Sequence, residues 1–178
     1  MDLERVIQDC RSALTLQDPA RAVHDVVAMA VSTPAAVTAM LGTPTRGGMH
    51  TIHHSHDLTI LNIVWTPGMA IMPHDHRMWS VIGIYGGRED NLFWRRVPHD
   101  RHGRIEPTDA RTLSQGEAAV LAADVIHSVR SPASGFTAAI HVYGGDFFGA
   151  RRSEWDFDSL SERPFDAEHA RRLFERAT

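Results

Sequence analysis

The sequence predicts a mainly β fold, a sandwich or barrel of short strands, with helices before it and one after it. Three observations lead to this expectation. Apolar residues recur at helical spacing up to about residue 42, short apolar runs bounded by Gly, Pro, Asp or Ser follow Gly48, and a capped helical pattern closes the chain. Many short strands at this spacing are typical of a two-layered or closed β fold, and a helical hairpin before it is expected to cover one face.

The first 42 residues predict three helices. Apolar positions repeat at helical spacing in the first helix, and Cys10 lies on that stripe, which favours packing over chemistry for its thiol. Asp18-Pro19 and Thr33-Pro34 each place proline directly after a capping residue, so the second and third helices are expected to begin there. The third helix is expected to end near Gly42.

The strands and the last helix complete the predicted domain. Asp166 is a suitable N-cap for a surface helix from Ala167 to Arg176. We expect one domain over 1–178, with a helical segment at 1–42, a β-barrel at 49–148 and a C-terminal helix at 165–178. The segments predicted as strands are 49–54, 58–65, 69–76, 79–85, 91–97, 117–121, 126–129 and 136–143.

Composition gives no sign of a protein that binds nucleic acid, is secreted or spans a membrane. The 178 residues carry a formal net charge of -4, which gives no reason to expect nucleic acid or an acidic membrane as a partner. A single cysteine permits no intramolecular disulfide. The N-terminus carries acids before any apolar run, unlike a signal peptide, and no apolar stretch is long enough to cross a bilayer. A cytoplasmic protein is therefore expected, and its oligomeric state stays open.

Histidines are the unusual feature of the composition, with 12 in the chain. His74 and His76 are two apart on a predicted strand, so their side chains share a face and can chelate a metal, whereas Asp75 faces the other way. His127 lies in a later apolar strand, where burying an unsatisfied imidazole costs about 1 to 3 kcal/mol. Metal ligation satisfies such a ring, so His127 is the expected third ligand.

Other polar residues leave alternatives open. Four histidines form a patch before the second strand, but their side chains alternate between faces, so we expect partly exposed residues, with His50 the one that faces the barrel. The remaining members are His53, His54 and His56. Glu89, after a Gly-Gly turn, either pairs with Arg88 or Arg95 or approaches the histidines.

The histidine spacing resembles the two motifs of the cupin superfamily. Gly68, five residues and then His74-Asp75-His76 is similar to the first motif; Gly116, five residues, a turn, two residues and then His127 is similar to the second. The segment AAIHVYGG, with His141 and Tyr143, resembles the His-x-Tyr pair of thiol dioxygenases of the cysteine dioxygenase type.

The resemblance implies a double-stranded β-helix, or jelly-roll barrel, that binds iron. It implies that His74, His76 and His127 are the ligands of Fe²⁺ and that Tyr143 places its hydroxyl near the substrate and O₂. It also implies that His141 lies next to the site and orients its residues without binding the iron. A packed barrel interior is the rival interpretation of His141 and Tyr143.

The residues themselves favour the same chemistry. General cupins supply a carboxylate a few residues after the histidine pair, but Trp, Ser, Val and Ile occupy 79–82 here. Three neutral imidazoles leave Fe²⁺ with its full charge, so the site favours an anionic ligand such as a thiolate. The expected enzyme is a thiol dioxygenase that converts a small thiol, of the cysteine or 3-mercaptopropionate type, and O₂ to the sulfinic acid.

The sequence also departs from this family. The only cysteine lies in the first helix, so Tyr143 is expected to be unmodified, and Ala139 replaces the serine that often precedes the histidine. The arginine that holds the substrate carboxylate in cysteine-oxidising members is missing, and Arg77 is the expected substitute, with Arg46 as the other candidate. Two further functions compete: a metal-dependent cupin oxygenase with a non-thiol substrate, and a non-enzymatic cupin that binds a metal or ligand.

Overall fold

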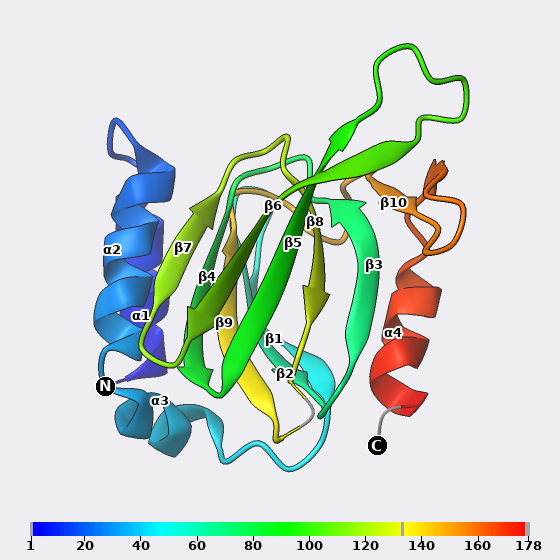
Figure 1. Ribbon diagram of the computed structural model, residues 1–178. Helices are drawn as coiled ribbons and strands as arrows, with labels where there is room; N and C mark the ends of the chain where they lie inside the picture. The colour runs from blue at the N-terminus through cyan, green and yellow to red at the C-terminus, as the bar shows by residue number, and fades with distance from the viewer. Residues whose placement is uncertain (1, 133, 177–178) are drawn as a thin grey trace.

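The computed structural model describes residues 2–132 and 134–176, and its helices lie on opposite sides of a β-barrel (Figure 1). Three helices precede the strands and one follows them. Asp2 and Asp18 cap the first two helices by accepting hydrogen bonds from backbone N–H groups, and of these caps the sequence predicts Asp18. The helices are α1 (Leu3–Ala13), α2 (Pro19–Val31), α3 (Pro34–Leu41) and α4 (Ala167–Arg176).

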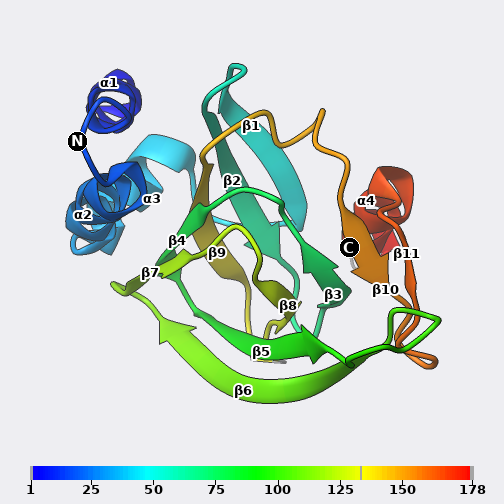
Figure 2. The ribbon, with the colours of Figure 1, turned by 90° about the horizontal axis from the view of Figure 1, so that it is seen from above.

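Two antiparallel sheets face each other and form the barrel, which Figure 2 shows from above. One has the strand order β1-β2-β9-β4-β7 and the other β11-β10-β3-β8-β5-β6. The strands of the first sheet are β1 (Gly48–His54), β2 (Thr59–Trp65), β4 (Ser80–Gly86), β7 (Ala118–Leu121) and β9 (Thr137–Tyr143). Those of the second are β3 (Ala70–Asp75), β5 (Arg88–Arg96), β6 (Ile105–Ser114), β8 (Ile126–Arg130), β10 (Ser153–Trp155) and β11 (Glu162–Pro164).

The pairing is that of a double-stranded β-helix. Strands β5 and β6 form a hairpin around 97–104, and β4–β7, β3–β8 and β2–β9 pair outward from it in nested order. From β2 to β5 and from β6 to β10, consecutive strands alternate between the two sheets, so one long antiparallel ribbon winds into the barrel (Figure 2). This confirms the expected mainly β fold with N-terminal helices and a short C-terminal helix.

The N-terminal helices cover the outer face of the first sheet. Strands β2 and β9 are buried along their whole length, which explains their nearly continuous apolar sequences. Helix α2 approaches β4 so closely that a Cβ at Gly83 would lie 2.4 Å from Cγ1 of Val27. Cys10 is fully buried in the same layer, and burial raises the pKa of its thiol to about 12, which supports the packing role expected for it.

The C-terminal segment closes the opposite side of the barrel. Strand β10 adds to the edge of β3, where Glu154 pairs with His74 in the register, and β10 then pairs with β11. Helix α4 follows, and its Phe174 packs with Phe165 against the cluster that contains Trp65.

Among the described residues, no single helix is long and apolar enough to cross a membrane; α2 and α3 pass that test only as a pair bent by 90°.

Candidate metal centre and cavity

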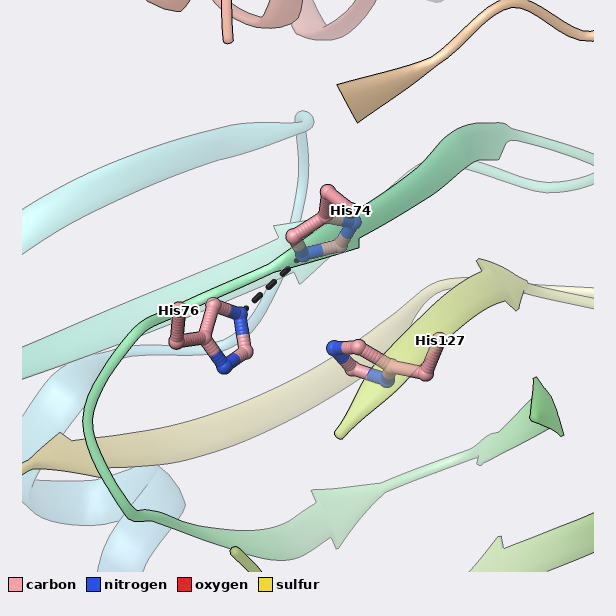
Figure 3. A group of neighbouring side chains, drawn as sticks. All are labelled: His74, His76 and His127. Atoms are coloured by element: carbon pink, nitrogen blue, oxygen red, sulfur yellow. Dashed lines mark hydrogen bonds between the residues drawn. The ribbon is translucent and has the colours of Figure 1, made fainter. Parts of the chain in front are cut away.

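Three histidines meet inside the barrel near the end of β3 (Figure 3). His74 on β3 stands directly opposite His127 on β8 in the strand register, and His76 follows immediately after β3. Their imidazoles each direct a nitrogen to a common region, with the candidate ligand atoms all within 4.8 Å of one another. The Nε2 atoms of His74 and His76 are 3.1 Å apart.

The outer nitrogen of each ring has a partner of its own. His74 Nδ1 donates to the carbonyl oxygen of Met72 at 2.9 Å, and His127 Nδ1 donates to Oδ1 of Asn91 at 2.8 Å. His76 Nδ1 lies 3.3 Å from the hydroxyl of Ser80. A proton on Nδ1 leaves a lone pair on Nε2, so His74 and His127 present acceptor nitrogens to the interior.

These inward nitrogens fit a cation. His127 Nε2 is buried without a hydrogen-bond partner in the described part of the chain. The Nε2 atoms of His74 and His76 lie 3.1 Å apart, and when the proton of His76 is on Nδ1 both atoms carry lone pairs that a positive ion between them can bind. Imidazole ligands with outer nitrogens held by oxygen atoms are the arrangement typical of bound transition metals.

Burial keeps the three rings neutral. It lowers the pKa of His74 to about 4, and together with the other histidine charges it holds the pKa values of His76 and His127 well below their usual range. At pH 7 all three are therefore ready to bind a metal without losing a proton. The set consists of nitrogen donors alone, which suits iron, zinc, copper or nickel better than magnesium or calcium.

A buried polar chain connects the metal-site histidines with Tyr143. Asn91, which accepts from His127, donates through Nδ2 to Oε1 of Glu89 at 3.0 Å. Glu89 Oε2 lies 3.7 Å from Nε2 of His141, whose Nδ1 is 3.2 Å from the hydroxyl of Tyr143. The carboxylate favours the His141 tautomer with the proton on Nε2, so Nδ1 accepts from Tyr143.

Glu89 and Asn91 resolve an alternative that the sequence left open. Both lie on β5, two residues apart and facing the barrel, and Glu89 is fully buried. Arg88 pairs instead with Asp90, and Arg95 with Glu106. Sequence reasoning missed Asn91, although its spacing from Glu89 is the one signal that links them.

Tyr143 borders the histidines directly. Its ring centroid is 5.0 Å from that of His76 and 4.3 Å from that of Phe147. Burial raises the pKa of its hydroxyl, so the phenol stays protonated near neutral pH. The structure thus brings His141 and Tyr143 to the same interior region as the three histidines.

A large cavity opens from the histidines toward the C-terminal segment. Its volume is about 1200 Å³, and its lining includes His74, His76, His127, His141 and Tyr143. Apolar side chains from four strands and from the C-terminal segment make most of the inner wall. They include Met49, Ile63, Trp65, Ile71, Phe165 and Phe174.

Arg152 packs against two aromatic rings of the cavity wall. Its guanidinium carbon lies 3.9 Å from the ring centroids of both Phe147 and Phe165. Those rings in turn lie 6.2 Å from His76 and 6.1 Å from His74. Burial lowers the pKa of Arg152 to about 10, so it keeps its charge at pH 7.

The two arginines expected to bind substrate lie elsewhere. Arg77 follows the histidine pair with φ at 58°, and this turn brings its Nε 2.8 Å from Oδ2 of Asp75. Neither Arg77 nor Arg46 lines the cavity that contains the histidines. The structure therefore does not bring Arg77 to the candidate centre, because the turn after β3 directs its side chain to Asp75.

The histidine patch also differs in one position from expectation. His50 is exposed, and Met49 lines the cavity in its place. His54 is exposed and lies 2.8 Å from Oδ1 of Asp146. The patch is otherwise partly exposed, as predicted.

The chain is similar to several solved structures. No protein-family profile matches the chain. An RmlC-like cupin protein with a double-stranded β-helix fold from Methanocaldococcus jannaschii has 12% identity and a TM-score of 0.48, over 60% of this chain and 86% of that one. A DMSP lyase from Ruegeria pomeroyi has 17% identity and a TM-score of 0.46, over 59% of this chain and 50% of that one.

An oxalate decarboxylase from Bacillus subtilis has 16% identity and a TM-score of 0.44, over 68% of this chain and 29% of that one. Likenesses at such identities say nothing of the reaction or substrate of this chain. The arrangement of strands described above places the chain among mainly β proteins with a double-stranded β-helix, and the site itself must indicate the chemistry.

Proposed function

We propose that this protein is a thiol dioxygenase in which His74, His76 and His127 hold Fe²⁺. The observation that carries the proposal is a buried cluster of three neutral imidazoles that, among the described residues, includes no carboxylate. Asp75 faces away from the cluster and pairs with Arg77, and Glu89 reaches His127 only through Asn91. A dipositive ion in such a site retains its charge and favours an anionic thiolate as the next ligand.

The reaction proposed is R–SH + O₂ → R–SO₂H. Both oxygen atoms end on sulfur, which loses four electrons while O₂ gains four, so no external reductant is needed. When bound, the iron would supply a Lewis acid that lowers the pKa of the thiol and a route for electrons between sulfur and O₂.

The remaining residues position the substrate and its protons. Tyr143 offers a protonated hydroxyl beside His76, and His141 fixes the direction of that hydroxyl by accepting from it. Arg152 offers the cation for a carboxylate on the substrate, the role that Arg77 was expected to fill.

Oxygen uptake by anaerobically iron-loaded protein tests this proposal. Cysteine, 3-mercaptopropionate, cysteamine and a non-thiol control are compared, and each product is checked for a mass gain of two oxygens from ¹⁸O₂. We expect uptake with a thiol, its loss in His127→Ala, and its retention in the matched control His56→Ala, because His56 is highly exposed and lies outside the site.

Two results would overturn the assignment. The first is tight iron binding without uptake for any thiol, including bulkier mercapto acids, which favours a non-enzymatic metal-binding protein. The second is uptake with a non-thiol acid alone, which favours a different oxygenase on the same fold.

A further inference from the structure

We propose that the substrate is a mercapto acid with a bulky apolar body, bulkier than cysteine or 3-mercaptopropionate, whose carboxylate binds Arg152 and whose thiol reaches the histidine cluster. This inference rests on the proposed thiol oxidation and names the substrate class for it. Three features of the cavity support the inference: its volume, its mainly apolar lining, and the charge of Arg152, whose guanidinium packs against two phenyl rings.

The size and the wall of the cavity do not match a small polar thiol. A volume of about 1200 Å³ lies above the range of about 300 to 1,000 Å³ in which proteins commonly enclose drug-sized ligands. Met49, Ile63, Trp65 and Ile71 come from three strands that converge on this space, and Phe174 reaches it from α4. A ligand with six or seven non-hydrogen atoms would leave most of this apolar wall in contact with water, whereas an aryl or branched alkyl body would cover it.

Arg152 supplies a charge that no acid of the described ranges pairs with directly, although Asp75 and Glu154 act on it at longer range. Its guanidinium lies between two phenyl rings, and in the described ranges it makes no ion pair or side-chain hydrogen bond. The nearby acids are engaged elsewhere: Asp75 pairs with Arg77, and Glu154 pairs with Arg163. A half-buried cation without a counter-ion gains most from a ligand that brings a carboxylate into the same apolar setting.

The charged side chains that line the cavity are mostly positive, as Arg152 is. Counted over the described residues, five arginines and two glutamates line the cavity, although the whole chain has a net charge of -4. Glu162 is already paired with Arg96. Arg163 is likewise paired, with Glu154 and Asp156. The positive charge that remains in the lining attracts an anion and disfavours a cationic thiol such as cysteamine. The arginines are Arg101, Arg151, Arg152, Arg163 and Arg171.

Ligands without a thiol test this inference independently of turnover. Isothermal titration calorimetry compares propionate, 3-phenylpropionate and the uncharged 3-phenylpropanol on metal-free and on iron-loaded protein. We expect 3-phenylpropionate to bind at least about tenfold more tightly than either of the others, because it alone satisfies both the apolar wall and Arg152. Equal affinity for propionate and 3-phenylpropionate, or no binding of either, would overturn the inference.

Two arginine variants distinguish a specific bond between Arg152 and the ligand carboxylate from a general effect of positive charge on affinity. Arg152→Met keeps an unbranched side chain between the rings and is expected to reduce the affinity for 3-phenylpropionate at least about tenfold, down to that of the alcohol. Arg95→Met removes an exposed arginine that pairs with Glu106 outside the cavity, and is expected to change the affinity less than twofold. The same loss in both variants would refute a specific role for Arg152.

The corresponding thiol then connects binding with the reaction. Iron-loaded protein is supplied with 3-mercapto-3-phenylpropionate and with 3-mercaptopropionate, and we expect at least tenfold higher kcat/KM for the former. If 3-phenylpropionate binds as expected but no thiol is oxidised, the proposed reaction fails while the ligand site stands. If thiols are oxidised but the phenyl group gives no advantage in binding or in kcat/KM, the inference about substrate class fails alone.

Discussion

Replacing Asn91 with alanine should weaken metal binding by 10- to 100-fold, although Asn91 is not itself a ligand. Asn91 is 4% exposed and accepts from Nδ1 of His127 at 2.8 Å, which fixes the ring and its proton. Loss of an oxygen partner behind a metal-bound histidine typically reduces metal affinity by about this factor, or about 1.4 to 2.7 kcal/mol.

The same variant should also destabilise the metal-free fold. Asn91→Ala leaves His127 Nδ1 and Glu89 Oε1 without their partners, and each unpaired buried group costs about 1 to 3 kcal/mol. Asn62→Ala is the matched control, because Asn62 is buried at 7% exposure and accepts from the hydroxyl of Tyr85 on the helix-covered side of the barrel. It should lower stability without changing metal affinity.

The assay is an anaerobic competition titration of Fe²⁺ against a chelator of known affinity, accompanied by thermal unfolding of each metal-free variant. Unfolding shows how much folded protein each sample contains, so a loss of fold is not mistaken for a loss of affinity. Equal metal dissociation constants for Asn91→Ala and wild-type protein would refute the reasoning. So would an equal loss in Asn62→Ala, since that would trace the effect to general destabilisation.

Three further predictions follow from buried groups. Tyr143→Phe should lower kcat for thiol oxidation at least about tenfold while metal affinity stays within twofold, measured by oxygen uptake and chelator competition. Because burial holds the pKa of His74 near 4, and those of His76 and His127 well below the usual value, metal affinity should be constant between pH 6 and 8 and fall only as the pH approaches 4; a loss centred on pH 6.5 would contradict this. Cys10, whose pKa is raised to about 12 by burial, should resist iodoacetamide at pH 8 in the native protein and react after unfolding, as mass spectrometry can measure.

Local signals in the sequence predicted most of the elements. Asp18-Pro19 starts α2 because a cap and a fixed proline φ act within one turn of the chain. Strand β6 was not predicted, since only its ends are buried and the middle of Ile105–Ser114 carries polar residues on both faces. Strand β5 begins at Arg88, earlier than expected, because the charged residues after the Gly-Gly turn include the buried Glu89. Periodicity detects a strand only where its two faces differ.

Sequence patterns predicted some residues of the candidate site and missed others. His74 and His76 are two residues apart at the end of β3, so their convergence follows from their spacing in an extended chain. His127 meets them across the register of β3 and β8, which the motif spacing anticipates. Arg152 has no such signal. It reaches the cavity because β10 pairs with the edge of β3, a contact between residues 154 and 74 that no local pattern encodes. Arg77 was favoured by its closeness in sequence, and its turn to Asp75 removes it from the cavity.

Glu89 is linked by hydrogen bonds through Asn91 to the histidine cluster. Glu89 is a fully buried carboxyl group whose Oε2 has no hydrogen-bond partner among the described residues, an arrangement that ordinarily destabilises a fold. Its Oε1 accepts a hydrogen bond from Asn91, and Asn91 accepts one from a proposed metal ligand, His127. A dipositive ion among three neutral imidazoles would place positive charge at the far end of that chain and offset the buried acid. Glu89, which is not a ligand, therefore supports the same conclusion as the ligands: this interior is built to hold a cation.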